Sequence, residues 1–227
     1  MAEFHFVEDY ERYVADLIKQ HPIDEAMALA VGGQFELIGK IERLILEYAG
    51  LEDGMAVIDL GCGSGRLAHA LGAGCKVDYL GIDVVSALLA YARTKAPAHY
   101  KFVLHRELSL PAADASADLA CAFSVFTHLL HAETYIYLAE MHRVLKPGGL
   151  VVFSFLEFGA GAHWTVFEQT VAHQRAKANP PLNTFIERSV IQVWCRHLGF
   201  ELLECIDGDQ PRWDGRLLGQ SIAILRR

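Results

Sequence analysis

The chain has no paired cysteines and no long apolar run. Its five cysteines are scattered and odd in number, without a Cys-x-x-Cys pair, which argues against both a disulfide framework and a zinc cage. The most apolar stretch, residues 119–130, is shorter than the ~18 residues that a membrane-spanning helix needs. Residues 1–13 also lack the basic start and apolar core of a signal peptide, so we expect a cytoplasmic protein with no membrane span.

Positive charge is also scarce, since the formal net charge is -8 and no long basic run occurs. The electrostatic footprint of a nucleic-acid-binding protein is therefore missing, and a small molecule, a lipid-like molecule or a protein is the better partner. The 11 histidines raise the question of a metal site. None of them forms a pair at four-residue spacing with an acidic partner, and we expect no bound metal.

The first fifty residues have the pattern of helices only. Apolar side chains recur at helical spacing over 1–20 and again over 34–49, and we expect one helix in each range. Between them we expect a helix break at His21-Pro22 and a turn over 30–33. Residues 1–50 are therefore predicted to form a helical cap, or lid, with Gly32 and Gly33 as its hinge.

From residue 51 onward, short strands alternate with helices. The expected strands are 56–60, 77–83, 101–105, 117–124, 150–157, 201–207 and 221–227. The expected helices are 66–71, 86–96 with Ser86 as N-cap, 131–145 ended by a turn over 146–149, 163–178 and 187–199. This order predicts a doubly wound α/β domain over 51–227, with a mostly parallel sheet, an antiparallel C-terminal hairpin and an insertion at about 158–185.

A glycine-rich loop, DLGCGSG at 59–65, follows the first expected strand. Glycines at alternate positions let the backbone turn sharply and approach a ligand closely. Ligands of open α/β sheets bind beyond the carboxyl ends of the strands, where this loop is expected. Its third glycine comes one residue earlier than in the dinucleotide fingerprint, and the carboxylate of Asp59 suits a ligand amine better than a pyrophosphate.

An aspartate ends the second expected strand. Asp83 comes 18 residues after Gly65, and an acidic residue at this place accepts hydrogen bonds from ribose hydroxyls in dinucleotide-binding folds. The alternative is an aspartate that caps the following helix, but Ser86 is the better candidate for that cap. We therefore predict that Asp83 binds a ribose.

Four segments combine these features: VIDLGCGSGRLA at 57–68, LGIDVVSALLAYA at 80–92, the stretch 110–129 and LAEMHRVLKPGGLVVFS at 138–154. In sequence and spacing they resemble the class I S-adenosylmethionine-dependent methyltransferases. The resemblance implies a Rossmann-like, seven-stranded sheet with its last strand antiparallel, S-adenosyl-L-methionine as cofactor and a small-molecule methyl acceptor. No motif indicates the oligomeric state.

The resemblance also implies roles for single residues. The cofactor contacts that it implies are Asp59, Gly61, Cys62, Gly63, Gly65, Asp83, Val84 and Ser124. The three glycines would pack along the methionine part, and Asp83 would bind the ribose. Relatives usually place an aspartate after the third strand, beside the adenine, where this chain reads HREL at 105–108. Glu107, or backbone groups of Glu107 and Leu108, is expected to take that place.

The chemistry is expected after the fourth strand, between Ser124 and His131. Methyl transfer from a sulfonium mainly needs alignment and a water-poor pocket, and some oxygen and nitrogen acceptors also need a general base. His128 and His131 are the candidate bases, because histidine takes up a proton near neutral pH. The alternative for His128 is a hydrogen bond to backbone that only shapes the loop.

Other interpretations stay open on the sequence alone. A nicotinamide-dependent oxidoreductase is disfavoured by the early third glycine and by Asp59, and a cofactor-binding member of the fold without transferase activity is the other alternative. The insertion is expected to help select the acceptor. Its stripe of Trp164, Phe167 and Val171 has the spacing of either a packed helix face or a pocket wall.

Overall fold

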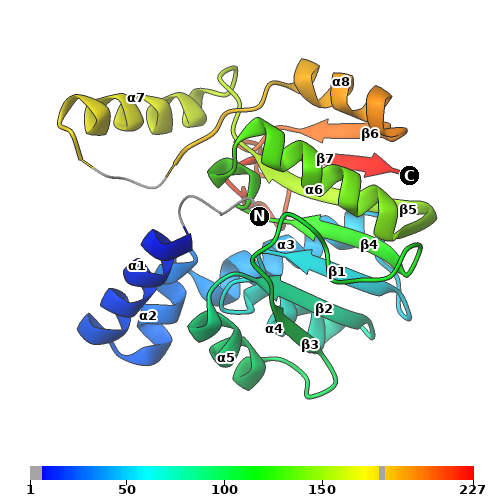
Figure 1. Ribbon diagram of the computed structural model, residues 1–227, viewed down its shortest axis with the longest axis horizontal. Coiled ribbons are helices and arrows are strands. Elements are labelled where there is room, and N and C mark those ends of the chain that lie inside the picture. The colour runs from blue at the N-terminus through cyan, green and yellow to red at the C-terminus, as the bar shows by residue number, and fades with distance from the viewer. Residues whose placement is uncertain (1–6, 179–181) are drawn as a thin grey trace. The chain divides into compact units, whose positions relative to one another are not determined.

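The structure is a computed structural model that describes residues 7–178 and 182–227. The chain divides into two compact units, Met1–Pro111 and Ala112–Arg227. Within each unit, helices pack against strands, such as α5 on β2 and β3 in the first unit and α8 on β6 in the second (Figure 1). No helix in the described ranges is long and apolar enough to cross a membrane.

The first unit begins with helices and continues with three strands. The helices before the sheet are α1 (Val7–Gln20), α2 (Ile23–Ala30) and α3 (Phe35–Ala49). The alternating elements that follow are β1 (Ala56–Leu60), α4 (Arg66–Gly74), β2 (Asp78–Asp83), α5 (Ser86–Lys95) and β3 (Lys101–Leu104). Both pairings, β1 with β2 and β2 with β3, are parallel, so Leu60, Asp83 and Leu104 end their strands at the same edge.

The second unit contains four strands. Its first elements are β4 (Ala117–Ala122), the short 3-10 helix η1 (Phe126–His128), α6 (His131–Val144) and β5 (Leu145–Phe155). The chain ends with α7 (Gly161–Arg175), α8 (Arg188–Leu198), β6 (Glu201–Ile206) and β7 (Ser221–Arg226). β4 pairs in parallel with β5, whereas β7 is antiparallel to both β5 and β6.

The seven strands follow the order β3-β2-β1-β4-β5-β7-β6. This order confirms the expected seven-stranded, mostly parallel sheet with an antiparallel strand near the C-terminus. The central strands are short apolar runs that are buried along most of their length, as in AVIDL and ADLACA. Strands of this composition are typical of a parallel sheet that is covered on both faces.

Helix α2 corrects the sequence-based expectation, which placed only a break and a turn between two longer helices. Pro22 occupies the N-cap position, and Asp24 and Glu25 lie in the first turn, where negative charge is favourable. These signals are present in the sequence. The helix has only eight residues, too few for the apolar spacing to stand out.

The start of α5 is also different from the expectation. Ser86 is the first helical residue and not the N-cap; Val85 holds that position and makes no side-chain cap. Instead, the Val85 N–H donates to Oδ1 of Asp83 at 2.9 Å. An aspartate at the strand end therefore orders the helix start, the role that the sequence reading assigned to the serine.

The turn over 146–149 does not separate α6 from the next strand. Helix α6 ends at Val144, and β5 begins at Leu145 and runs through the turn sequence. Gly148 has a φ of 81°, a conformation that glycine adopts without strain. The strand expected at 150–157 thus starts five residues earlier and ends at Phe155.

The first two helices pack against the start of α5. Figure 1 shows α1 and α2 side by side, and their apolar faces join an apolar cluster with the segment after β2. Its fully buried members are Val14, Met27, Ala30, Val85 and Leu88. This cluster attaches the N-terminal helices to the strand end that carries Asp83.

Candidate functional site

The loop between β1 and α4 has a backbone that only glycine forms easily. Gly61, Gly63 and Gly65 have φ values of 72°, 54° and 85°, all in the left-handed region. The N–H groups of Gly61 and Cys62 donate to the carbonyl of Ile82 at 2.7 and 3.1 Å. The loop is therefore tied to the end of β2, at the carboxyl edge where the sequence predicted a ligand.

Close packing excludes side chains from this loop. An added Cβ on Gly63 would lie 2.7 Å from Cγ1 of Val31, and one on Gly65 would lie 2.7 Å from Cβ of Ala92. The thiol of Cys62 points toward β2, since a Cβ on Gly81 would lie 2.9 Å from its sulfur. Burial raises the pKa of the Cys62 thiol, so this side chain is a neutral packing group. The contact of Cys62 with a cofactor stays a prediction.

Asp83 fastens the loop from the other side. Its side chain is buried, and Oδ2 accepts the N–H of Gly63 at 2.8 Å while Oδ1 accepts the N–H of Val85. Burial raises the pKa of Asp83, and these backbone N–H groups oppose that rise. The N–H of Val84 also bonds to this carboxylate. A carboxylate offers about four acceptor sites, so acceptor capacity remains for the predicted bond to a ribose hydroxyl.

Asp59 is buried at the end of β1. Its carboxylate accepts a hydrogen bond from the hydroxyl of Tyr79 at 2.5 Å. Tyr79 lies on β2, and its ring stacks on that of Tyr100 with centroids 4.9 Å apart. The role of Asp59 toward a ligand amine stays a prediction, because this carboxylate is already engaged inside the fold.

The segment after β3 continues the same edge. The N–H of His105 donates to the carbonyl of Asp83 at 3.0 Å, and Nε of Arg106 donates to the carbonyl of Val84 at 3.1 Å. Glu107 is exposed and Leu108 is half-buried. The structure therefore brings the glycine loop, Asp83, Val84 and the 105–108 segment together, as the sequence predicted for a nucleoside cofactor.

These residues fit an adenosyl cofactor. The loop turns through three left-handed glycines at the carboxyl edge of the sheet, and the carboxylate of Asp83 lies at the adjacent strand end, within hydrogen-bond distance of the Gly63 N–H. The pyrophosphate-binding fingerprint has its third glycine three residues after the second, whereas in this loop Gly65 comes two residues after Gly63.

The N-terminal helices contact this cradle directly, which sequence reasoning did not foresee in detail. The Ser64 hydroxyl donates to the carbonyl of Met27 at 3.0 Å, and Arg66 donates to the carbonyl of Val31 at 2.5 Å. Arg66 also forms an ion pair with buried Glu42 at 2.6 Å. Residue 66 is where the dinucleotide motif has glycine, and here it joins α3 and the end of α2 to the loop.

In the second unit, Ser124 follows β4 with a left-handed φ of 58°. This conformation costs a non-glycine residue energy, and such strain often marks a functional site. The Ser124 N–H donates to Oγ of buried Ser154 at 2.7 Å, and Ser154 in turn donates to Oε1 of Gln220 at 2.6 Å. Ser154 and Gln220 were not among the predicted site residues, since neither belongs to a recognisable motif.

Both candidate bases hold the backbone of the segment 182–186. Nδ1 of His128 donates to the carbonyl of Leu182 at 2.7 Å, and Nε2 of His131 donates to the carbonyl of Phe185 at 3.0 Å. The N–H of Thr184 donates to the carbonyl of Thr127 at 2.8 Å. The alternative interpretation of His128, a hydrogen bond to backbone, is therefore correct for one of its two ring nitrogens.

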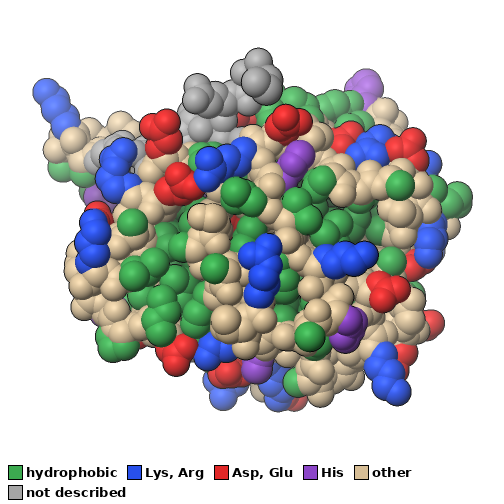
Figure 2. Space-filling model, turned by 60° about the horizontal axis from the view of Figure 1, so that its bottom comes forward, with side chains coloured by type: hydrophobic (Ala, Val, Ile, Leu, Met, Phe, Trp, Pro, Cys, Tyr) green, Lys and Arg blue, Asp and Glu red, His purple; other side chains and the backbone are tan. Residues whose placement is uncertain are grey.

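The distribution of charge and of metal-ligating side chains can be described for the residues that the structure covers. On the face in Figure 2, the described Lys and Arg side chains are scattered among acidic and apolar ones and form no continuous strip. Within the described ranges, no group of three His, Cys, Asp or Glu side chains is placed to hold a metal ion.

Comparison with known proteins identifies the family. Residues 58–153 match the family model described as a methyltransferase domain. The chain is 30% identical over 180 residues to a ubiquinone biosynthesis O-methyltransferase of Nitrosococcus oceani, covering 75% of each protein. The chain belongs to the class I S-adenosylmethionine-dependent methyltransferases. This methyltransferase is also 28% identical over 188 residues to a malonyl-acyl-carrier-protein O-methyltransferase of Pectobacterium atrosepticum, covering 79% of this chain and 70% of that protein.

A solved structure supports the fold over the whole length. The magnesium protoporphyrin IX methyltransferase of Synechocystis PCC 6803, with bound S-adenosylhomocysteine, matches with a TM-score of 0.68 over 100% of both chains at 17% identity. As a member of this family, the methyltransferase uses S-adenosylmethionine, which supplies an activated methyl group on a sulfonium. The oxidoreductase interpretation is set aside by these relatives.

Replacing Asp83 tests the nucleoside half of the site. We expect Asp83→Ala to weaken the binding of S-adenosylhomocysteine by ~1–3 kcal/mol, because hydrogen bonds to a charged acceptor are lost. Titration calorimetry measures this change in binding free energy. Asp83→Asn keeps one acceptor oxygen, so we expect it to lose less affinity. The exposed Asp209→Ala is the matched control. An unchanged dissociation constant in a folded Asp83→Ala protein would remove Asp83 from the site.

Proposed function

We propose that this methyltransferase acts on a hydroxyl oxygen of a small molecule, and that His128 accepts the hydroxyl proton. The observation that carries the proposal is the tautomer of the His128 ring, which the hydrogen bond to Leu182 fixes. Its Nδ1 must carry a hydrogen, because the carbonyl of Leu182 can only accept. The second nitrogen, Nε2, has no hydrogen-bond partner among the described residues and is left as the basic site.

The protonation state of His128 supports this role. Burial lowers the pKa of His128 from the ordinary 6.5, and the bond to Leu182 only partly offsets the effect. The ring is therefore neutral at neutral pH, the form in which Nε2 can take up a proton. A base fixed by a backbone carbonyl needs no reorientation before it acts.

His131 is the weaker candidate. Its Nε2 is used by the carbonyl of Phe185, and its ring packs edge-on against Trp194 with centroids 5.6 Å apart. The residue is exposed at the first position of α6. We assign His131 to holding the segment 182–186 in place.

The relatives favour oxygen over nitrogen as the acceptor atom. Both curated relatives described above carry the name O-methyltransferase. Among oxygen acceptors, a hydroxyl must lose its proton during transfer and therefore needs a base. A carboxylate is already ionised at neutral pH and needs none. His128 therefore supports a hydroxyl.

The insertion supplies aromatic side chains for such an acceptor. Phe158 stacks on Phe185 with centroids 4.6 Å apart, and Phe167 and Trp164 complete the cluster. Phe158 and Trp164 are 43% and 46% exposed, unusually high for large apolar side chains beside a packed cluster. We propose that the exposed rings contribute an apolar wall for the acceptor, rather than core packing alone.

Replacing His128 tests the proposed base. We expect His128→Asn to lower kcat by about 10²–10⁴-fold, because its amide keeps the bond to Leu182 but offers no base. Binding of S-adenosylhomocysteine should not change. The assay follows S-adenosylhomocysteine formation with a panel of phenols, and His131→Gln, which retains the bond to Phe185, is the matched control.

The pH profile adds a second readout of the same proposal. The neutral form of His128 is the active one, so kcat should hold at neutral pH and fall as the pH drops through the lowered pKa, below 6.5. The acid limb should be missing in His128→Asn. Full activity of this variant with the acid limb intact would contradict the role of His128.

We further propose that residues 1–50 form a cap that must move before the cofactor binds. Gly63 and Asp83 are buried beneath the N-terminal helices, with Val31 directly against Gly63. A ribose needs the acceptor oxygens of Asp83, which is only 6% exposed. Gly32, Gly33 and Gln34 all have left-handed φ values of 86°, 80° and 50°, which supports a hinge at this connection.

Removing one hydroxyl should loosen the cap. The Tyr10 hydroxyl donates to the carbonyl of Ala30 at 2.5 Å and joins α1 to the end of α2. Such a bond contributes ~0.5–1.5 kcal/mol, so we expect Tyr10→Phe to raise the association rate of S-adenosylhomocysteine by about 2- to 10-fold. Kinetic surface plasmon resonance measures the rate, and Tyr13→Phe, an exposed tyrosine on the same helix, is the control. Equal rates in both variants would argue against cap opening as the slow step.

A further inference from the structure

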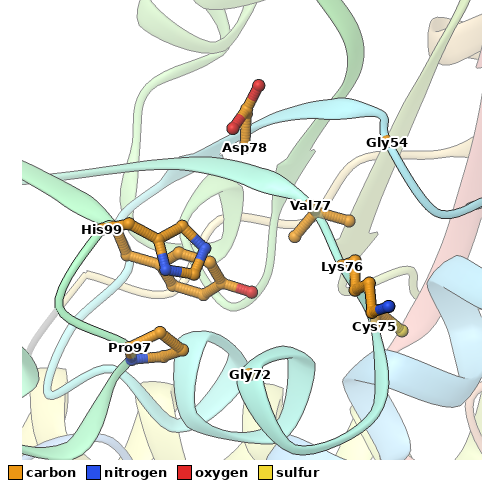
Figure 3. Close-up of a pocket in the computed structure, with 9 residues that line it drawn as sticks. Gly54, Gly72, Cys75, Lys76, Val77, Asp78, Pro97 and His99 are labelled. Carbon is orange, nitrogen blue, oxygen red and sulfur yellow. The ribbon is translucent and has the colours of Figure 1, made fainter.

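The cavity in Figure 3 lies in the first unit, beside the amino ends of β2 and β3, and has a volume of about 390 Å³. Pro97 and His99 lie on one side of it and Val77 on the other, while the carboxylate of Asp78 points away from it. Asp83 ends β2 at the opposite edge, so this cavity is separate from the cofactor site. We assign no ligand to it, because the carboxylate at its rim is turned outward.

A different polar group, the side-chain amide of Gln220, is held in one orientation in the second unit. The Ser124 N–H donates to Oγ of Ser154 at 2.7 Å, and the Ser154 hydroxyl donates to Oε1 of Gln220 at 2.6 Å. The Ser124 hydroxyl donates to the same oxygen at 3.3 Å. Ser154 is fully buried, and the opposite orientation of the amide would leave its hydroxyl hydrogen unpaired.

The amide nitrogen of Gln220 is left with two unused donor hydrogens. It has no hydrogen-bond partner among the described residues, and it is accessible to solvent on a half-buried side chain. The two serines already fix the rest of the amide. A ligand that accepts these hydrogens therefore immobilises little that is still free to move, and this lowers the entropic cost of binding.

Gln220 lies at the carboxyl edge of β4 and β5. Ser124 comes two residues after the end of β4, and Ser154 is the last residue but one of β5. Strand β7 starts directly after Gln220 and runs antiparallel to β5, so its first residue pairs with the last residue of β5. Ligands of such sheets bind beyond the carboxyl ends of the strands. The η1 helix, which ends at the proposed base His128, begins two residues after Ser124.

The strained backbone of Ser124 belongs to the same arrangement. With its left-handed φ of 58°, both its N–H and its hydroxyl reach the pair formed by Ser154 and Gln220. A strained residue persists only where its surroundings hold it, and such residues cluster at ligand sites. Backbone strain and a fully buried serine thus both act on the position of one glutamine amide.

The chemistry of an amide NH₂ group selects its ligand. The group can only donate, so it fits an oxygen that can only accept, in a carbonyl or a carboxylate. The buried carboxylate of Glu157, which accepts a hydrogen bond from the neighbouring Ser221, is also paired with Arg188 at 2.7 Å. This pairing reduces the repulsion that an isolated negative charge would exert on an anionic ligand.

We propose that the amide of Gln220 selects the methyl acceptor by donating to a carbonyl or carboxylate oxygen that the acceptor carries besides its reacting hydroxyl. This inference rests on the proposed small-molecule hydroxyl acceptor and adds a residue that determines specificity. His128 and Gln220 then hold the acceptor at two points, and this fixes the orientation of its hydroxyl for transfer.

The test follows the side-chain amide signal of Gln220 in the ¹⁵N-labelled full-length protein saturated with S-adenosylhomocysteine. The signal is identified by its loss in Gln220→Glu. The probes are 2-, 3- and 4-hydroxybenzoate and the three cresols, in which a methyl group replaces the carboxylate. We expect at least one hydroxybenzoate to shift this signal saturably and to bind about 10-fold or more tightly than its cresol, the scale of a hydrogen bond to a charged group.

The substitution Gln220→Glu separates the donor from the rest of the network. It keeps an oxygen for both serines but replaces the two donor hydrogens with an acceptor. We expect the affinity for the hydroxybenzoate to fall by about 10-fold or more, while the affinities for the cresol and for S-adenosylhomocysteine stay unchanged. Gln192→Glu, at an exposed position of α8, adds the same charge and should bind all three like the unsubstituted protein.

The proposal is overturned if no hydroxybenzoate shifts the Gln220 signal, if hydroxybenzoate and cresol bind equally, or if Gln220→Glu binds the hydroxybenzoate with unchanged affinity. A loss of S-adenosylhomocysteine affinity in Gln220→Glu would assign the amide to the cofactor and would also overturn it. These are binding measurements, so full turnover by His128→Asn would remove the proposed base and leave their result standing.

Discussion

The carboxylate of Asp83 holds two separate stretches of backbone at once. One oxygen fixes Gly63 in the loop after β1, and the other fixes Val85 at the start of α5. The left-handed turns of the loop would cost any other residue energy, so the loop keeps its shape through glycine and through this buried anchor. The cofactor site that we predict depends on this arrangement, because the carboxylate that orders the backbone is also the predicted acceptor for a ribose.

The cap follows from the same geometry. Helices α1 and α2 pack against Val85 and Leu88 in an apolar cluster. Hydrogen bonds from the side chains of Ser64 and Arg66 to the carbonyls of Met27 and Val31 join the end of α2 to the glycine loop. These contacts stabilise the protein and leave Asp83 buried beneath the N-terminal helices. On our proposal that this cap opens for the cofactor, cofactor affinity includes the free energy of opening, and a ligand shifts the equilibrium only by its preference for the open form.

Features that depend on local residue types, such as turns and strand order, could be predicted from the sequence. Contacts between residues far apart in the chain could not. The left-handed glycine loop, the order of the strands and the antiparallel hairpin follow from local residue types, and all are found in the structure. Several strands end one or two residues earlier than expected, such as β4 at Ala122. Ser86 illustrates the limit: it has the best local cap chemistry, yet Asp83 takes the role because the strand end places its carboxylate there. Gln220 contacts Ser124 across 96 positions of the chain, and no local pattern signals such a pair.

The central claim is that the glycine loop and Asp83 bind an adenosyl cofactor beneath a cap. The most direct measurement is titration calorimetry of the intact, folded protein with S-adenosylmethionine and S-adenosylhomocysteine. The account predicts one site per chain for both compounds, with the two competing. No binding of either compound to a protein shown to be folded would contradict it.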